Sequence, residues 1–335
     1  KKQDLKDNWD RIAVKKYNAD EVVVKYTSGS TGTPFKMIMD KYKHARWIAG
    51  NKVLRALDGV KSNEKTMFIS TNVADKNIPM ERQERDNVYY LDYRYLGEDA
   101  FSDLIQRLMS ENFKTITAIS SVYEAMARYI ISGKAPKWNG KLIAIFAMSE
   151  LLKDNTRKII EEYFECPMYS YYANEENGAF AIEDGSGNGH LLNTVDYHFE
   201  VLKMDSDEPT EDGEVGRLII TDYFNKAFPI IRYENGDLVS LKHFKDGRVY
   251  ITKLMGRVAD VLYTTDGTMV DIFHAISFLE PCQDIKQFQL VQDDYDKLTW
   301  ILNTSNHTHE EFIVNESKKL FVCAPLGQLE CILSA

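Results

Sequence analysis

The stretch from Lys141 to Tyr172 constrains the fold more than any other part of the sequence, because it joins two kinds of apolar pattern in one short run. A continuous apolar segment, LIAIFAM at residues 142–148, predicts a buried strand. An amphipathic helix from about residue 152 to 164 and a short strand near residues 167–170 are expected to follow. A strand–helix–strand order favours a parallel sheet with helices packed on its faces.

The sequence before this stretch favours further helices around the same sheet. A β-branched strand at residues 22–26 precedes a helix expected at residues 42–57, with Trp47, Ile48, Val53 and Leu54 on one side. Further amphipathic helices are expected at residues 100–109 and 122–131.

After Leu191 the sequence changes to short strands, which are separated by Asp-Gly or Asn-Gly pairs. Such pairs supply the positive φ that tight turns require. The expected corners are Asp212-Gly213, Asn235-Gly236 and Asp246-Gly247. Beyond Gly256, the expected elements are a helix at residues 270–279, strands at 285–291 and 298–302, and a helix near 310–320.

We therefore expect an α/β protein of two domains. The large domain, residues 1–255, should contain mixed and parallel sheets flanked by helices up to about residue 190 and a β-rich subdomain at residues 191–255. A small, mobile α+β domain should occupy residues 256–335. A chain of 335 residues has room for two such domains.

Composition excludes several classes of protein. The net charge of −10 disfavours binding to a nucleic-acid backbone, which requires a surplus of Lys and Arg. The longest apolar run, residues 142–148, is far shorter than the ~20 residues of a membrane span, and no signal segment is evident. Four widely spaced cysteines without a CxxC pair indicate reduced thiols, so we expect a cytoplasmic protein. The sequence leaves the oligomeric state open, a homodimer included.

Small and hydroxyl-bearing residues crowd the segment Tyr26–Lys36, YTSGSTGTPFK. Such a loop can surround an anion with backbone N–H groups and hydroxyls. It is not a Walker A loop, because Pro34 stands where that pattern needs its second glycine.

The same segment resembles the phosphate-binding loop of the acyl-adenylate-forming superfamily, which includes acyl-CoA synthetases, peptide-synthetase adenylation domains and luciferases. Residues 27–34 match every position of its Ser/Thr-Ser-Gly-Ser/Thr-Thr-Gly-x-Pro core. Phe35 separates the proline from Lys36, which is similar to the phenylacetate–CoA ligase and capsule-biosynthesis branch. The resemblance implies catalytic roles for Thr31 and Lys36.

Two further segments resemble motifs of that family. YANEENG, residues 172–178, is similar to its Y-G-x-T-E segment, which implies that Glu176 holds Mg²⁺; a register starting at Tyr171 would give Glu175 that role. Hard Mg²⁺ prefers carboxylates together with substrate phosphates. FAMSELL, residues 146–152, is similar to the strand-end segment that passes the adenine and implies a role for Glu150, while Ser149 would also suit a helix cap.

The last two matches lie nearer the C-terminus. RYENGD, residues 232–237, resembles the Y-R-x-G-D segment, in which the aspartate accepts hydrogen bonds from the ribose; Asp237 would otherwise be a plain turn residue. KLMGRVADVL, residues 253–262, resembles the hinge motif G-R-x-D-D, with Ala259 replacing the first aspartate. The implied hinge residues are Gly256, Arg257, Ala259 and Asp260. The implied nucleotide-binding residues are Thr27, Ser28, Gly29, Ser30, Thr31, Gly32, Thr33, Glu150, Tyr172, Asn174, Glu175, Asp237 and Arg257.

The resemblance implies an AMP-forming acid–thiol ligase. A carboxylic acid would react with MgATP to give acyl-AMP and pyrophosphate, and a thiol, most simply that of coenzyme A, would displace AMP. Tyr171 and Phe180 are candidate walls of the acyl pocket. Two alternatives stay open: an impaired or repurposed relative that binds nucleotide or acyl-adenylate, and an acyl-protein synthetase that passes the acyl group to a cysteine such as Cys323 or Cys331. Because no lysine follows Lys319, where the family has a catalytic one, we expect that the chain lacks a C-terminal tail. The resemblance also implies a missing N-terminal segment, because members of this branch carry a longer stretch before the phosphate-binding loop.

Overall fold

The computed structural model describes residues 1–27, 35–70, 78–92, 98–257, 262–265, 269–270, 279, 282, 285, 287–304, 309–321 and 328–334. The chain forms two compact units. The first contains residues 1–235 and 240–253, and the second contains residues 236–239 and 254–335. Within the described residues, no helix is long and apolar enough to span a membrane.

Parallel strands form one half of the main sheet of the first unit. They lie in the order β4 (Val88–Asp92), β3 (Thr66–Ser70), β5 (Thr115–Ile119), β6 (Ala144–Met148) and β7 (Met168–Asn174). Residues 145–147 of β6 pair in parallel with residues 168–170 of β7, and α8 (Asp154–Phe164) connects these strands. The predicted strand–helix–strand unit is therefore confirmed.

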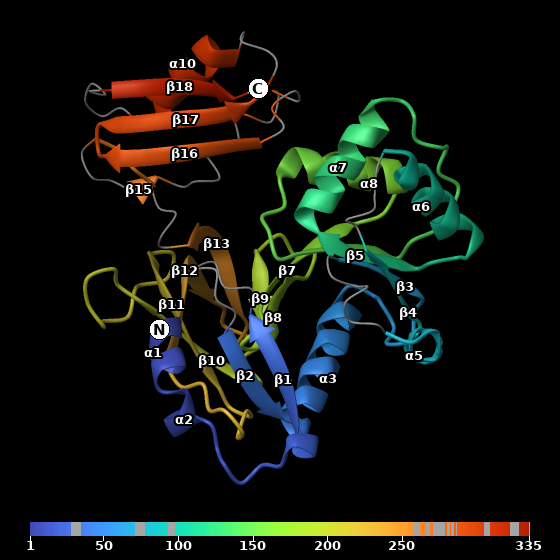
Figure 1. Ribbon diagram of the computed structural model, residues 1–335, viewed down its shortest axis with the longest axis vertical. Helices are drawn as coiled ribbons and strands as arrows, with labels where there is room; N and C mark the ends of the chain where they lie inside the picture. Colours follow the sequence, from blue (N-terminus) through green and yellow to red (C-terminus); the bar gives the residue numbers. More distant parts are fainter. Residues whose placement is uncertain are drawn as a thin grey trace. The chain divides into compact units, whose positions relative to one another are not determined.

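Helices cover both faces of the parallel strands. Helices α6 (Glu98–Ser110), α7 (Ser120–Ile131) and α8 pack on one face, and α3 (Lys41–Leu57) lies on the other (Figure 1). Alternate residues of each strand reach opposite faces. Thus Ile145 of β6 belongs to the core under α7 and α8, whereas its neighbour Phe146 packs beside Leu54 of α3. A short helix, α5 (Met80–Asp86), precedes β4.

The inward face of α3 differs from the one that the sequence predicted. Ile48 is 44% exposed and Val53 is 62% exposed, although both were expected on the packed side with Leu54. A lysine, Lys43, is instead 1% exposed. Lys43 forms an ion pair with the buried Asp222, which comes from a strand far along the chain. The spacing of apolar residues in the sequence gives no indication of such a partner.

Antiparallel strands form the other half of the same sheet. Beyond β7 the order is β8 (Gly178–Glu183), β9 (His190–Leu192), β13 (Val249–Arg257), β12 (Tyr233–His243), β11 (Val215–Asp222) and β10 (Tyr197–Leu202). The predicted fold class, mixed and parallel strands flanked by helices with a β-rich part, is confirmed. The expected corner at Asn235-Gly236 is wrong, because both residues lie inside β12.

A two-stranded ribbon flanks the phosphate-loop segment. Strands β1 (Val22–Thr27) and β2 (Phe35–Asp40) pair antiparallel, with Thr27 opposite Phe35. The apolar side of β2 forms a core with Phe228 and with residues of α1 (Lys2–Asp7) and α2 (Trp9–Ile12), and the 3₁₀ turn η1 (Ala19–Glu21) leads into β1.

The second unit contains a three-stranded sheet and a helix. Strand β17 (Lys297–Asn303) pairs antiparallel with β16 (Gln287–Asp294) and parallel with β18 (Gln328–Ser334). Trp300 is fully buried and donates to Ser317 of α10 (His309–Phe321) at 2.8 Å. A short ribbon joins β14 (Leu262–Tyr263) to β15 (Met269–Val270). Val270, expected to begin a helix, therefore ends a strand, and residues 271–278 of that helix lie outside the described residues.

Candidate active site

The phosphate-loop residues Ser28, Gly29, Ser30, Thr31, Gly32 and Thr33 lie outside the described residues. The positions on either side of the loop are defined, because Thr27 ends β1 and Phe35 begins β2. Lys36, on β2, is exposed, and its Nζ lies 5.4 Å from the centre of the Trp9 ring. The Trp9 indole also donates to the carbonyl of Lys36 at 2.9 Å, which fixes the backbone beside the loop.

Two motifs that are far apart in the sequence meet through Tyr172. Its hydroxyl accepts a hydrogen bond from Asn235 Nδ2 at 2.8 Å, and its ring packs edge-on against Phe180 with the ring centres 4.7 Å apart. Tyr172 and Asn235 are 8% and 9% exposed. The end of β7 is therefore held directly to the beginning of β12.

A second contact between the same motifs holds Glu176. Its carboxylate accepts a hydrogen bond from the Tyr233 hydroxyl at 3.1 Å and lies 3.4 Å from Lys2 Nζ. Glu176 is 5% exposed, whereas the neighbouring Glu175 is exposed. Among the described residues, contacts hold the Glu176 side chain in a fixed orientation, and none is seen for the Glu175 carboxylate.

The turn that carries these glutamates is tightly packed. Asn174 Oδ1 accepts from the Asn177 backbone N–H at 2.7 Å, which closes the turn. Gly178 follows with φ of 99°, and a Cβ there would lie 1.9 Å from Trp47 Nε1 of α3. Only glycine tolerates both the left-handed backbone and this close approach.

A buried ion pair supports the turn that carries Glu176. Lys43 Nζ lies 2.6 Å from Asp222 Oδ2 and donates to the Tyr197 hydroxyl at 2.8 Å, and that hydroxyl donates to the carbonyl of Asn177. Burial lowers the pKa of Lys43, and the Asp222 carboxylate opposes this effect. Burial also raises the pKa of the Tyr197 hydroxyl, which therefore stays protonated. The network joins α3, β10 and β11 to the turn after β7.

Glu150 caps the beginning of helix α7. Its carboxylate accepts from the Ser121 N–H at 2.7 Å and its carbonyl accepts from Ser120 Oγ at 2.9 Å, so it caps the first turn of α7. Ser149 has φ of 68° and does not cap α8, whose N-cap position is Lys153. The suggested cap is therefore wrong, because the chain turns through a left-handed residue before the helix begins.

Two residues of the second unit that the sequence predicts to bind the nucleotide contact each other. Arg257 Nε lies 3.1 Å from Asp237 Oδ1, and the Asp237 side chain is 14% exposed. Gly256, beside Arg257, has φ of 84°. The other hinge residues, Ala259 and Asp260, lie outside the described residues.

Sequence reasoning missed Asn235 and Lys2. The glycine that follows Asn235 favours a turn there, although Asp237, two residues further on, marks the segment as functional. Lys2 carried no signal, since an ammonium in a charged helix normally faces solvent.

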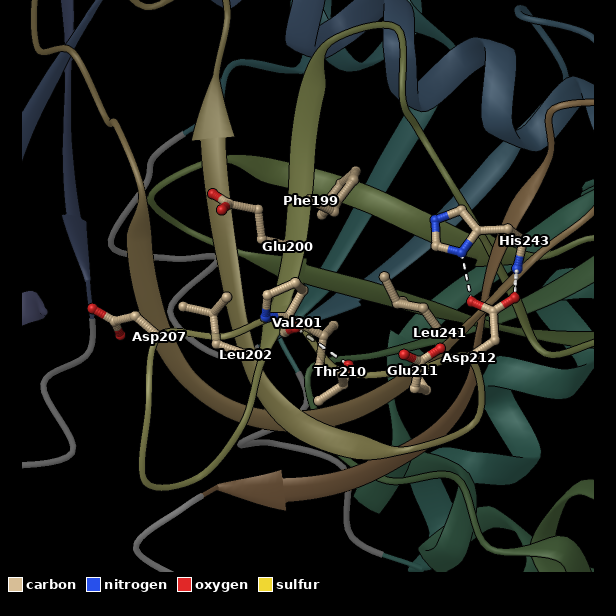
Figure 2. A pocket seen from close by; sticks show the side chains of 11 residues that line it. Phe199, Glu200, Val201, Leu202, Asp207, Thr210, Glu211, Asp212, Leu241 and His243 are labelled. Carbon is tan, nitrogen blue, oxygen red and sulfur yellow. Dashed lines mark hydrogen bonds and ion pairs between the residues drawn. The ribbon is translucent and has the colours of Figure 1, made fainter.

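A cavity of about 220 Å³ lies elsewhere in the first unit, near the ends of β10 and β12 (Figure 2). Several of its charged residues have partners: Asp212 contacts His243 at 2.6 Å, and Glu200 contacts Arg232 at 3.1 Å. Across the described residues, no three His, Cys, Asp or Glu side chains are grouped as a metal site would need. We do not assign a function to this cavity.

Comparison with solved structures identifies the class of fold. A 2-hydroxyisobutyryl-CoA ligase in the postadenylation state, in complex with R3-HIB-AMP, matches with a TM-score of 0.72 and 14% identity, over 95% of this chain and 71% of that chain. A benzoate CoA ligase from Burkholderia xenovorans LB400 matches with a TM-score of 0.64 and 14% identity, over 96% and 66%. The chain therefore has the fold of the adenylate-forming acyl-CoA ligases, as its motifs indicated.

Sequence comparison adds one curated relative. The chain is 26% identical to Protein CapK of Staphylococcus aureus in an alignment 334 residues long, which covers 95% of this chain and 71% of that protein. No family model matches the chain. A third solved structure, O-succinylbenzoate coenzyme A synthetase from Bacillus subtilis in complex with ATP and magnesium, has a TM-score of 0.63 and 13% identity over 93% of this chain and 66% of that one.

Proposed function

We propose that this protein is an AMP-forming acid–thiol ligase that activates a carboxylic acid with ATP. The observation that carries the proposal is the junction of two motifs, in which Tyr172 meets Asn235 and Glu176 meets Tyr233. The sequence alone assigns both motifs to the nucleotide site, and these four residues bring them into contact within the first unit. The fold it shares with the CoA ligases supports the same reading.

In the proposed first step, a substrate carboxylate oxygen attacks the α-phosphorus of ATP, and the bond to the bridging oxygen breaks. Pyrophosphate leaves with that electron pair, and acyl-AMP forms. Tyr172 and Asn235 would border the adenine. Asp237 would accept hydrogen bonds from the ribose hydroxyls, and Arg257 would orient the Asp237 carboxylate. Holding the reactants in this way supplies orientation. Thr31 and Lys36 would bind the phosphates.

Glu176 fits a magnesium ion by its chemistry, because a carboxylate is the ligand type that Mg²⁺ prefers beside phosphates. The Tyr233 hydroxyl fixes its direction, and the weakly paired Lys2 ammonium can move away when a cation arrives. Bound Mg²⁺ would offset the negative charge of the phosphates. Exposed Glu175 would serve the same ion only after reorientation.

In the proposed second step, a thiol attacks the acyl carbon and AMP leaves. Coenzyme A is the simplest acceptor. Cys166 does not fit the role, because burial raises the pKa of its thiol to about 12, and Cys282 is buried as well. The similarity to Protein CapK supports placing the chain in the capsule-biosynthesis branch.

ATP–pyrophosphate exchange tests the proposal. The full-length protein is assayed with MgATP across a panel of carboxylic acids, and at least one acid should stimulate exchange. Asp237→Ala should weaken ATP binding measured by calorimetry, while Asp246→Ala, on an exposed turn, serves as the matched control. ATP binding without exchange for any acid would reject the ligase and favour a nucleotide-binding relative.

A further inference from the structure

Helix α1 places a lysine beside the candidate metal ligand. Lys2 Nζ lies 3.4 Å from Glu176 Oε1, and the Lys2 and Glu176 side chains are 29% and 6% exposed. The Tyr233 hydroxyl donates to the same carboxylate oxygen at 3.1 Å. The Lys2 ammonium therefore lies next to the group that the proposed function assigns to the metal.

The helices at the start of the chain also contact the strand that follows the phosphate loop. Leu5 of α1 and Trp9 of α2 pack against the core that contains Phe35, the first residue of β2. The Trp9 indole donates to the carbonyl of Lys36 on the same strand at 2.9 Å. Helices α1 and α2 therefore connect the strand after the phosphate loop with the turn that carries Glu176.

Lys2 would lose its counter-ion when a metal binds. Within the described part of the chain, Glu176 is the only carboxylate within 4.0 Å of Lys2 Nζ. Glu234, which the adjacent Lys1 reaches, already pairs with Arg217 at 2.9 Å. A cation that coordinates Glu176 would neutralise its carboxylate and leave a largely buried ammonium unpaired, which costs free energy. The phosphates that arrive with the cation supply the missing anion, because lysine binds phosphate as a point charge.

The position of Lys2 favours one end of the nucleotide. Tyr172 and Asp237 are assigned to the adenine and the ribose, whereas Glu176 is assigned to the metal beside the phosphates. A cation that lies 3.4 Å from Glu176 is therefore expected to meet the polyphosphate end of ATP.

We propose that Lys2 is a further catalytic residue, whose ammonium pairs with the pyrophosphate part of MgATP once Glu176 binds the metal. When the bond between the α-phosphorus and the bridging oxygen breaks, the electron pair passes to pyrophosphate, and Lys2 stabilises the charge that develops there. Lys2 exchanges no proton in this step. The assignment rests on the proposed ligase function. A lysine that only neutralised Glu176 would instead compete with the metal.

Calorimetry of the full-length protein tests this role with MgATP and with AMP, which lacks the pyrophosphate part. Lys2→Met should weaken MgATP binding by about 10- to 100-fold, the range expected for one charge-assisted contact, and should leave AMP binding unchanged. Lys2→Arg keeps the charge and should retain most of the affinity. Lys15→Met, at an exposed position shortly after α2, is the matched control. In ATP–pyrophosphate exchange, Lys2→Met should raise the KM for pyrophosphate by a similar factor.

The outcomes separate this inference from the proposed function. Unchanged or tighter MgATP binding by Lys2→Met overturns the phosphate contact, and exchange that continues in that variant leaves the ligase standing. An equal loss of MgATP and AMP affinity also overturns the contact, because it reports damage to the whole site. MgATP binding that depends on Lys2, in a protein that supports exchange with no acid, retains the contact and rejects the ligase. If the unaltered protein binds no MgATP, both are overturned. If Lys2→Met does not fold, Lys2→Gln carries the same comparison.

Discussion

Asp58 offers a direct test of the packing at the end of α3, because its carboxyl group is buried without a hydrogen-bond partner among the described residues. Its pKa is raised from 3.8 to about 7, mainly by burial and in addition by the nearby Asp184 and Glu183 carboxylates, while Arg55 opposes these effects. The folded protein therefore holds this proton to higher pH than the unfolded chain does. Below pH 3.8 both states are protonated and Asp58 costs nothing.

As the pH rises from 3.8 to about 7, the unfolded state loses the proton first, so Asp58 destabilises the fold progressively. The whole difference corresponds to about 4 kcal/mol above pH 7. We expect Asp58→Asn to recover about 2 kcal/mol, because the ionised side chain can gain some hydration by moving and the amide also has to be buried.

Urea denaturation at a series of pH values measures this effect. The stability difference between Asp58→Asn and the unaltered protein should be near zero at pH 4 and should grow to its full value by pH 8. Asp246→Asn is the control of opposite sign, since the hydrogen bond from Arg248 lowers the pKa of exposed Asp246. A difference that does not change with pH, or that decreases as the pH rises, would refute the argument.

Three further substitutions test the turn and its support. Gly178→Ala places a methyl group against Trp47 and should destabilise the protein by at least about 2 kcal/mol in urea denaturation, with part of the loss recovered when Trp47→Ala is added. Lys43→Met leaves Asp222 buried without its cation and should cost about 3–5 kcal/mol in the same assay, whereas Lys43→Met combined with Asp222→Leu should be much milder. Tyr233→Phe removes the hydrogen bond that the Tyr233 hydroxyl donates to Glu176. Half-maximal ATP–pyrophosphate exchange should then need severalfold more magnesium, while the free energy of unfolding should fall by only about 1 kcal/mol. A Tyr233→Phe protein with an unchanged magnesium requirement would contradict the metal assignment.

The sequence predicted those parts of the fold that local patterns control. The apolar run of β6 and the periodicity of α8 were sufficient for the parallel sheet, because burial of a continuous strand leaves a continuous apolar segment. It did not predict which side of α3 faces inward. A lysine in a helix normally predicts a solvent-exposed position. Lys43 is buried because Asp222, from a strand far along the chain, pairs with its ammonium group.

The candidate site was predictable in its motifs but not in its contacts. Matching segments marked Tyr172, Glu176 and Asp237, yet the hydrogen bonds that hold the first two come from Asn235 and Tyr233, which local rules assign to a turn and a strand. The motif around Glu150 predicts a nucleotide contact and gives no sign that its carboxylate also caps α7. Long-range partners carry no signature in the local sequence.

Strand β7 serves both faces of the sheet, because alternation along it sends Tyr171 under α3 and Tyr172 toward Asn235. The register of β7 with β8 shifts immediately afterwards, between Tyr172 and Ala173. A bulge at this point re-aims the residues that follow it, which include the turn that ends at Gly178. The face of β7 under α3 and the turn that carries Glu176 are therefore set by the same strand. For this reason, substitutions that loosen β7 should reduce acid-dependent exchange and ATP binding together.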